Sequence, residues 1–150
     1  MPERPRAIVV DASVVLKWQL DDEEHIPQAI ALRDDFSKRG VTKLLAPNLL
    51  VYEVINGIVT ATKLKRIPLP KAVEAVSNLM ALGIELKDVE SRQVAELALR
   101  YNLTAYDAAH LALAEVQNCE LWTGDRAFYQ STKNTTMSVR WLGDYVAEQR

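Results

Sequence analysis

Short apolar runs alternate along the chain with longer stretches in which apolar and polar residues recur at helical spacing. The runs are rich in β-branched residues or leucine and are bounded by charged residues, proline or glycine, which is typical of buried strands. They predict strands at residues 6–11, 43–47, 84–89, 120–123 and 138–142. The stretches between them predict helices at residues 13–18, 22–38, 48–65, 68–82, 91–101, 104–116 and 125–130.

This alternation of strands and helices predicts the α/β class, with a mostly parallel sheet covered by helices on both faces. In such sheets, ligands bind at the carboxyl ends of the strands, where the strand order reverses. Asp11 ends the first predicted strand, and Asp125 follows the fourth. Both acids are therefore expected on the edge of the sheet where a site forms.

Four acidic residues lie within or beside apolar segments that are expected to be buried. Their surroundings are AIVVDAS, LLVYEVING, TAYDAAHLALA and ELWTGDRAF, and the acids are Asp11, Glu53, Asp107 and Asp125. Burying an unpaired carboxylate is costly, and carboxylates gathered in one cleft raise one another's pKa unless a positive charge neutralises them. A hard divalent cation such as Mg²⁺ or Mn²⁺ does this and suits phosphate-ester chemistry. The sequence therefore predicts a metal-dependent enzyme acting on phosphodiesters.

The two acids that follow strands also have a simpler explanation, namely helix capping. Asp11, or Ser13 after it, can cap the next helix, and Asp125 can cap the helix that begins after it. The hydroxyl of Ser13 can also orient Asp11 or a metal-bound water. Gly124 allows a tight turn, and the hydroxyl of Thr123 can bind the aspartate carboxylate or a phosphate oxygen. Capping and metal binding both remain open for these acids.

The two acids on predicted helices have local alternatives as well. Glu53 lies three residues before Asn56 on one helical face, so it can be a buried acid hydrogen-bonded to Asn56 or to the backbone. Thr104 and Asp107 form a capping-box pattern. One turn later, His110 is expected to be a hydrogen-bonded helix histidine, because no second histidine or cysteine joins it. The tryptophan and tyrosine residues are expected in the core or at its rim.

Composition fits a single domain spanning residues 1–150. A chain of 150 residues with 49% hydrophobic and 25% charged residues can build one core, and this balance argues against disorder. The apolar runs are far too short for a membrane span, and the first residues lack the apolar core of a signal peptide. With a single cysteine, Cys119, an intrachain disulfide is excluded, so a cytoplasmic setting is expected.

Charge leaves a nucleic-acid partner open. The net charge is −2, but setting the four acids aside leaves 16 acidic residues against 18 lysine and arginine residues. The rest of the chain is then slightly positive, which is compatible with a phosphate-containing partner. The densest basic run, residues 63–66, is more typical of a solvated helix end than of a phosphate track.

At these residues the chain closely resembles the PIN-domain family, and within it the VapC-type toxin ribonucleases of toxin–antitoxin pairs. The resemblance covers nearly the whole chain in order, through VVDASVVLKW, APNLLVYEVING, LTAYDAAHLALA and LWTGDRAF. It implies a three-layer α/β/α sandwich with the four acids as catalytic and metal-binding residues. It also implies supporting roles for Ser13, Asn56 and Thr123.

The resemblance further implies an endoribonuclease that uses Mg²⁺ or Mn²⁺ to activate water against RNA. It implies a small antitoxin protein as inhibitor and a homodimer as the usual assembly. Three alternatives stay open: an RNA-processing PIN nuclease without an antitoxin, a non-catalytic PIN module that binds RNA or protein, and, less favoured, a phosphatase of the haloacid dehalogenase type. The last chemistry requires a second aspartate where this chain has Ser13.

Overall fold

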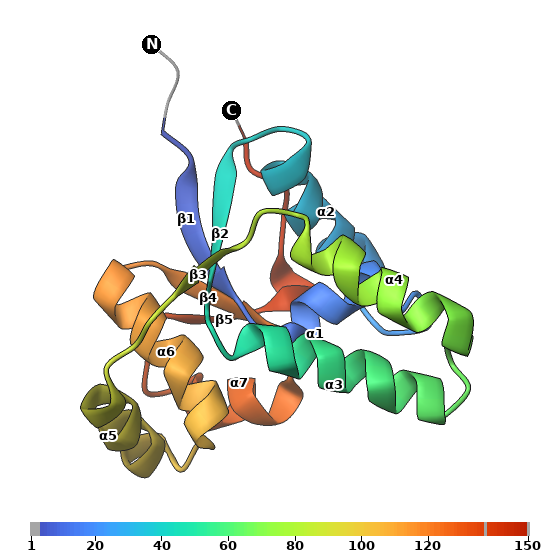
Figure 1. Ribbon diagram of the computed structural model, residues 1–150. Helices are drawn as coiled ribbons and strands as arrows, with labels where there is room; N and C mark the ends of the chain where they lie inside the picture. Colours follow the sequence, from blue (N-terminus) through green and yellow to red (C-terminus); the bar gives the residue numbers. More distant parts are fainter. Residues whose placement is uncertain (1–3, 137, 150) are drawn as a thin grey trace.

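A parallel sheet runs through the centre of the molecule (Figure 1). The computed structural model describes residues 4–136 and 138–149. Within these residues the sheet has five strands, namely β1 (Arg6–Val10), β2 (Thr42–Pro47), β3 (Glu85–Lys87), β4 (Glu120–Thr123) and β5 (Val139–Trp141). Their order is β3-β2-β1-β4-β5, and every neighbouring pair is parallel. The predicted parallel sheet is confirmed, and its strand order reverses between β1 and β4.

Helices cover both faces of this sheet. They are α1 (Ala12–Val15), α2 (Ile26–Ser37), α3 (Leu50–Lys63), α4 (Leu69–Met80), α5 (Ser91–Tyr101), α6 (Ala105–Gln117) and α7 (Arg126–Thr132), with 3₁₀ turns at Leu16–Trp18 and Leu142–Asp144. Successive side chains of a strand point to opposite faces. Accordingly Ile8 and Val10 of β1 pack in a core with α1 to α4, whereas Val9 packs in a second core with α5, α6 and α7. The predicted three-layer α/β/α architecture is therefore confirmed.

The predicted helix at 22–38 is wrong at its start. Helix α2 begins at Ile26, because His25 has a left-handed backbone with φ of 60° and residues 21–25 form turns. Asp22 and Glu23 in this turn both accept hydrogen bonds from Arg66, which follows α3. Part of the basic run at 63–66 is thereby used in a structural ion pair.

A buried acid, Asp35 of α2, fixes the last described residues to the fold. Its side chain accepts hydrogen bonds from the Tyr145 hydroxyl at 2.6 Å and from the Glu148 amide at 2.9 Å, and it pairs with Arg39. Burial alone would raise the pKa of Asp35, but these donors outweigh it and hold the pKa below its ordinary value.

Both ends of the described chain meet at the amino-terminal edge of the sheet. Arg6, which opens β1, forms ion pairs with Glu120 at 2.6 Å and with Glu148 at 3.3 Å. The two ends lie on the same side of the molecule in Figure 1. The opposite edge, where the strands end, is left for the acids.

No helix within residues 4–136 or 138–149 is long and apolar enough to cross a membrane.

Candidate functional site

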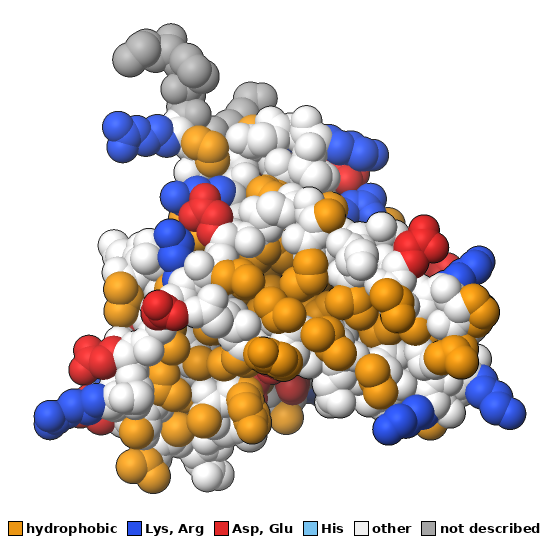
Figure 2. Space-filling view, viewed as in Figure 1, with side chains coloured by type: hydrophobic (Ala, Val, Ile, Leu, Met, Phe, Trp, Pro, Cys, Tyr) orange, Lys and Arg blue, Asp and Glu red, His pale blue; other side chains and the backbone are white. Residues whose placement is uncertain are grey.

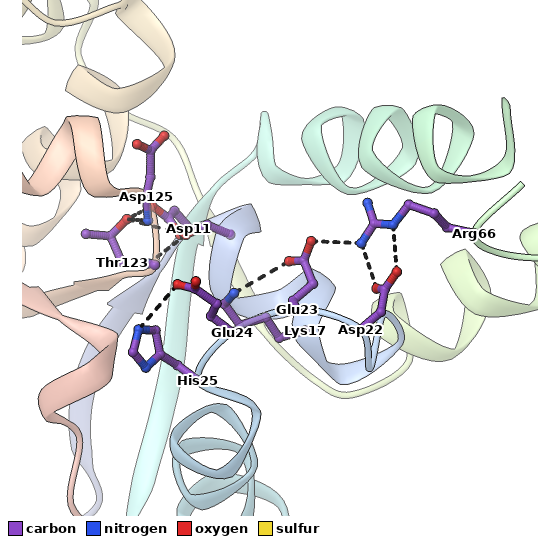
Figure 3. Close-up of polar contacts among 11 residues, drawn as sticks. Asp11, Lys17, Asp22, Glu23, Glu24, His25, Arg66, Thr123 and Asp125 are labelled. Atoms are coloured by element: carbon purple, nitrogen blue, oxygen red, sulfur yellow. Dashed lines mark hydrogen bonds and ion pairs between the residues drawn. The ribbon is translucent and has the colours of Figure 1, made fainter. Parts of the chain in front are cut away.

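The four predicted acids come together at the carboxyl edge of the sheet. Asp11 follows β1 and Asp125 follows β4, the two strands between which the order reverses. Glu53 lies on the first turn of α3, and Asp107 on the first turn of α6. Two of them, Asp11 and Asp125, lie beside Thr123 in Figure 3.

The carboxylates are close enough for their charges to act on the pKa values of Asp11, Glu53 and Asp107. The negative charge of Asp11 raises the pKa of both Glu53 and Asp107. Asp125 raises the pKa of Asp107 and of Asp11. Carboxylates on four different elements therefore share one electrostatic environment, as the sequence predicted.

Asp11 is the most buried of the four acids, with 5% of its surface exposed. The Thr123 hydroxyl donates to one carboxylate oxygen at 2.5 Å, and the Ser13 hydroxyl donates to the other. The Gly124 amide in turn donates to Ser13 Oγ at 2.7 Å. Burial is the main cause that raises the pKa of Asp11, and the two hydroxyl donors oppose it. Asp11 is thus held in one orientation by Ser13 of α1 and by Thr123 at the end of β4.

Neither Asp11 nor Ser13 caps a helix with its side chain. Asp11 occupies the N-cap position of α1 but makes no capping hydrogen bond there, so the capping explanation is wrong for this pair. Thr123 binds a carboxylate, as the sequence suggested, but that carboxylate belongs to Asp11 rather than to Asp125. The hydroxyl oxygen of Thr123 also accepts a hydrogen bond from the Asp125 amide at 3.0 Å.

Asp125 caps a helix and also belongs to the acidic group, whereas α6 is capped by Thr104 rather than by the carboxylate of Asp107. Asp125 is the N-cap of α7, and its Oδ1 accepts the Phe128 amide at 3.1 Å. Asp107 donates its amide to the N-cap residue Thr104 at 3.1 Å. Burial, followed by Asp11 and Asp125, raises the pKa of Asp107 to about 6. The helix ends therefore fix the backbone of these acids while their carboxylates stay in the acidic group.

Glu53 is the acid with the fewest partners. Burial, then Asp11 and Asp107, raises its pKa to about 7. Its Oε1 is buried and has no hydrogen-bond partner among the described residues. The expected hydrogen bond from Asn56 or the backbone to this oxygen is absent from that part of the chain. A buried carboxylate oxygen without a partner is costly unless a ligand or a proton satisfies it.

His110 faces this oxygen, a contact that the sequence did not predict. Its Nδ1 donates to the Tyr106 carbonyl at 2.8 Å, so the expected hydrogen-bonded helix histidine is confirmed. Its Nε2 lies 3.4 Å from Glu53 Oε1. When the proton of neutral His110 is on Nδ1, Nε2 is a hydrogen-bond acceptor, and so is the Glu53 oxygen that it faces. A proton or a cation is therefore needed between these two atoms. The spacing of His110 three residues after Asp107, on the same helical face, was the available signal.

Lys17 is a second residue that sequence reasoning missed. Its side chain is 8% exposed, and its Nζ lies 3.5 Å from Glu23, which Arg66 also binds (Figure 3). A Cβ atom added to Gly124 would lie 3.0 Å from Lys17 Cε. The Lys17 side chain therefore lies beside the turn that carries Asp125. One buried cation thus borders the acidic group.

The donor set suits a hard cation, although the side chains are not closed around one. Within the described ranges, no three Asp, Glu, His or Cys side chains approach closely enough to hold a metal ion as they stand. The acids nevertheless supply carboxylate oxygens, one of them buried and unpartnered, with raised pKa values in Glu53 and Asp107. Oxygen-rich anionic sites of this kind fit Mg²⁺ or Mn²⁺.

Comparisons with known proteins agree with this fold. A family model described as the PIN domain matches residues 8–134. Over 118 residues the chain is 31% identical to VapC ribonuclease Mb0985 of Mycobacterium bovis and to ribonuclease VapC9 of Mycobacterium tuberculosis, covering 79% of this chain and 85% of each relative. The crystal structure of PAE2754 from Pyrobaculum aerophilum shares the fold, with a TM-score of 0.69, 24% identity and coverage of 91% of this chain and 90% of that one. The chain therefore belongs to the PIN-domain family, and within it to the VapC type.

Proposed function

We infer that the protein is a metal-dependent endoribonuclease and the toxin of a type II toxin–antitoxin pair. The observation that carries this inference is the electrostatically coupled group of four acids at the carboxyl edge of the sheet. Its relatives named as VapC ribonucleases support RNA as the substrate. Residues 1–150 would act as one nuclease domain.

The four acids would hold Mg²⁺ or Mn²⁺. A bound cation lowers the pKa of a water molecule and neutralises charge that builds on the phosphate. The chain's own task is to position the carboxylates. Ser13 and Thr123 hold Asp11 from both sides, and the ends of α6 and α7 hold the backbones of Asp107 and Asp125.

A direct test is cleavage of RNA by the purified protein with Mn²⁺ or Mg²⁺. We expect cleavage that EDTA removes and that added Mn²⁺ restores, because the carboxylates alone cannot neutralise the phosphate. An Asp11→Asn protein purified in parallel controls for contaminating nucleases. RNA binding without turnover at every Mn²⁺ concentration would instead favour a non-catalytic PIN module.

Metal binding should depend on pH because the acids must lose their protons to bind a cation. With pKa values of about 7 for Glu53 and about 6 for Asp107, the metal-free site holds protons near neutrality. Mn²⁺ affinity is therefore expected to rise from about pH 5.5 to about pH 8, with protons released on binding. Titration calorimetry in two buffers of different ionisation enthalpy measures both quantities. Glu53→Gln should abolish the part of the proton release centred near pH 7; an affinity that is constant over this range contradicts the prediction.

Three partners follow from the same proposal: an RNA substrate, a small antitoxin protein that inhibits cleavage, and a second copy of the chain. Apolar side chains gather in a band over α3 and α4 on the face shown in Figure 2. The exposed members on these helices include Val59, Leu69 and Val73. An exposed apolar area of this kind is typical of a protein-binding surface.

If no small protein encoded beside this chain inhibits it, the alternative of a processing nuclease without an antitoxin is favoured. The proposed setting is cytoplasmic.

A further inference from the structure

Next to the acidic group lies a cavity of about 560 Å³ that the four acids alone do not explain. Two helices line it, α3 with Tyr52, Glu53 and Asn56, and α6 with Tyr106. Ala12, which directly follows Asp11, completes the side toward the strand ends. The cavity and the acidic group therefore share Glu53 as a common wall.

Both tyrosines are unusually exposed for large aromatic side chains. Tyr52 is 75% exposed and Tyr106 is 62% exposed, so neither contributes to a core. Their backbones are nevertheless fixed, because each lies within the first turn of a helix. The Tyr106 carbonyl also accepts a hydrogen bond from the buried His110 ring. Aromatic rings that line a cavity from fixed backbone positions provide a platform for stacking, whereas the sequence had placed the tyrosines in the core or at its rim.

We propose that this cavity binds an unpaired nucleobase of the RNA, stacked on Tyr52 and Tyr106, beside the phosphate that is cleaved. The inference rests on the proposed nuclease function and adds to it a subsite that holds one base. A ligand that fills the cavity has to satisfy an apolar, aromatic wall on one side and the acidic group with its cation on the other. A nucleotide does both, because its base is flat and apolar on its faces while its phosphate binds the cation.

The edge of the base also finds a partner in the cavity. Asn56 lies on the wall one helical turn after Glu53, and its amide both donates and accepts hydrogen bonds. An amide can pair with the edge of an unpaired base, as single-stranded RNA readers use polar side chains to do. In a duplex, the faces and the pairing edge of the base are both covered, so paired RNA cannot enter this cavity.

The test is binding of a short, fluorescently labelled single-stranded RNA, measured by anisotropy in the Asp11→Asn protein so that the RNA stays intact. We expect the double variant Tyr52→Ala/Tyr106→Ala to bind about tenfold or more weakly, and the Tyr52→Phe/Tyr106→Phe variant to stay within about threefold. Leu99→Ala, which removes another exposed apolar side chain, is the matched control and should not change affinity.

Replacing single bases of the RNA by abasic nucleotides makes the test specific. One abasic position should weaken binding to the parent protein about as much as the tyrosine replacements do, and should cost nothing further in the double alanine variant. An abasic penalty that is equal in both proteins overturns the inference. Unchanged affinity in the double alanine variant also overturns it. So does a loss of affinity that occurs only together with a change in the molecular mass of the protein, measured by light scattering. Metal-dependent cleavage that persists unchanged in the tyrosine variants rejects the base-binding cavity alone, whereas absence of cleavage with tyrosine-dependent binding rejects the nuclease function alone.

Discussion

Replacing Asp11 by asparagine is expected to lower the rate of RNA cleavage more than about 100-fold while leaving the fold intact. Loss of a group that merely orients a metal ligand typically costs about 10- to 100-fold, so removing a proposed ligand itself should cost more. The fold should survive because asparagine has the same shape: one hydroxyl can still donate to its amide oxygen, and the other can reorient to accept from its NH₂ group. Initial cleavage rates with Mn²⁺ and urea unfolding measure the two effects.

Two further variants separate the proposed metal role from other effects of removing an acid. Asp125→Asn should lose activity but little stability, because asparagine caps helices about as well as aspartate does. Asp34→Asn removes an acid on α2 that pairs with Arg33 and Lys38, and it should retain full activity. Full cleavage by the Asp11→Asn protein, or an equal loss in Asp34→Asn, would contradict the assignment of the acidic group as the active site.

Replacing Thr123 by valine is expected to reduce cleavage about 10- to 100-fold, because the side chain orients Asp11 without touching the substrate. Valine keeps the shape of threonine but removes the donor to Asp11 and the acceptor for the Asp125 amide. Losing the donor also makes the Asp11 carboxylate harder to ionise, so the pH at which activity rises should move upward. A pH–rate profile and Mn²⁺ titrations detect this shift, which a purely structural role of Thr123 would not produce.

Thr123→Ser provides the matched control for this experiment. Serine restores the hydroxyl, so it should recover most of the activity and the original pH profile. A serine variant as impaired as the valine variant would show that the methyl group, and hence packing in the buried strand, is what matters at this position.

Much of the site was predictable because its acids break the apolar pattern in which they lie. Asp11 and Asp125 end strands, and the parallel alternation alone puts strand ends on one edge. Whether an acid caps a helix or joins the site was not decidable from spacing, since Asp125 does both and Asp11 only the second. Local sequence defines a cap, but only tertiary packing decides what else the carboxylate faces.

The residues that sequence reasoning missed depend on contacts between distant parts of the chain. Asp35 lies in a charged segment typical of a solvated helix surface, and Lys17 is a single charge in an otherwise uncharged segment, yet both are buried. Asp35 is covered by Tyr145, 110 residues away in sequence. Lys17 is covered where the turn after β4 passes over it. Nothing in the periodicity of a helix marks which of its charged residues a remote segment will cover.

The ion pairs that join Arg6 to Glu120 and Glu148 have a practical consequence for labelling. They hold the start of β1 and the last described residues together at the amino-terminal edge of the sheet. The length of the strands separates this edge from the four acids. A fluorophore, affinity tag or surface tether attached beside these residues is therefore expected to lie away from the acidic group. Immobilised protein should then report the same affinities as protein free in solution.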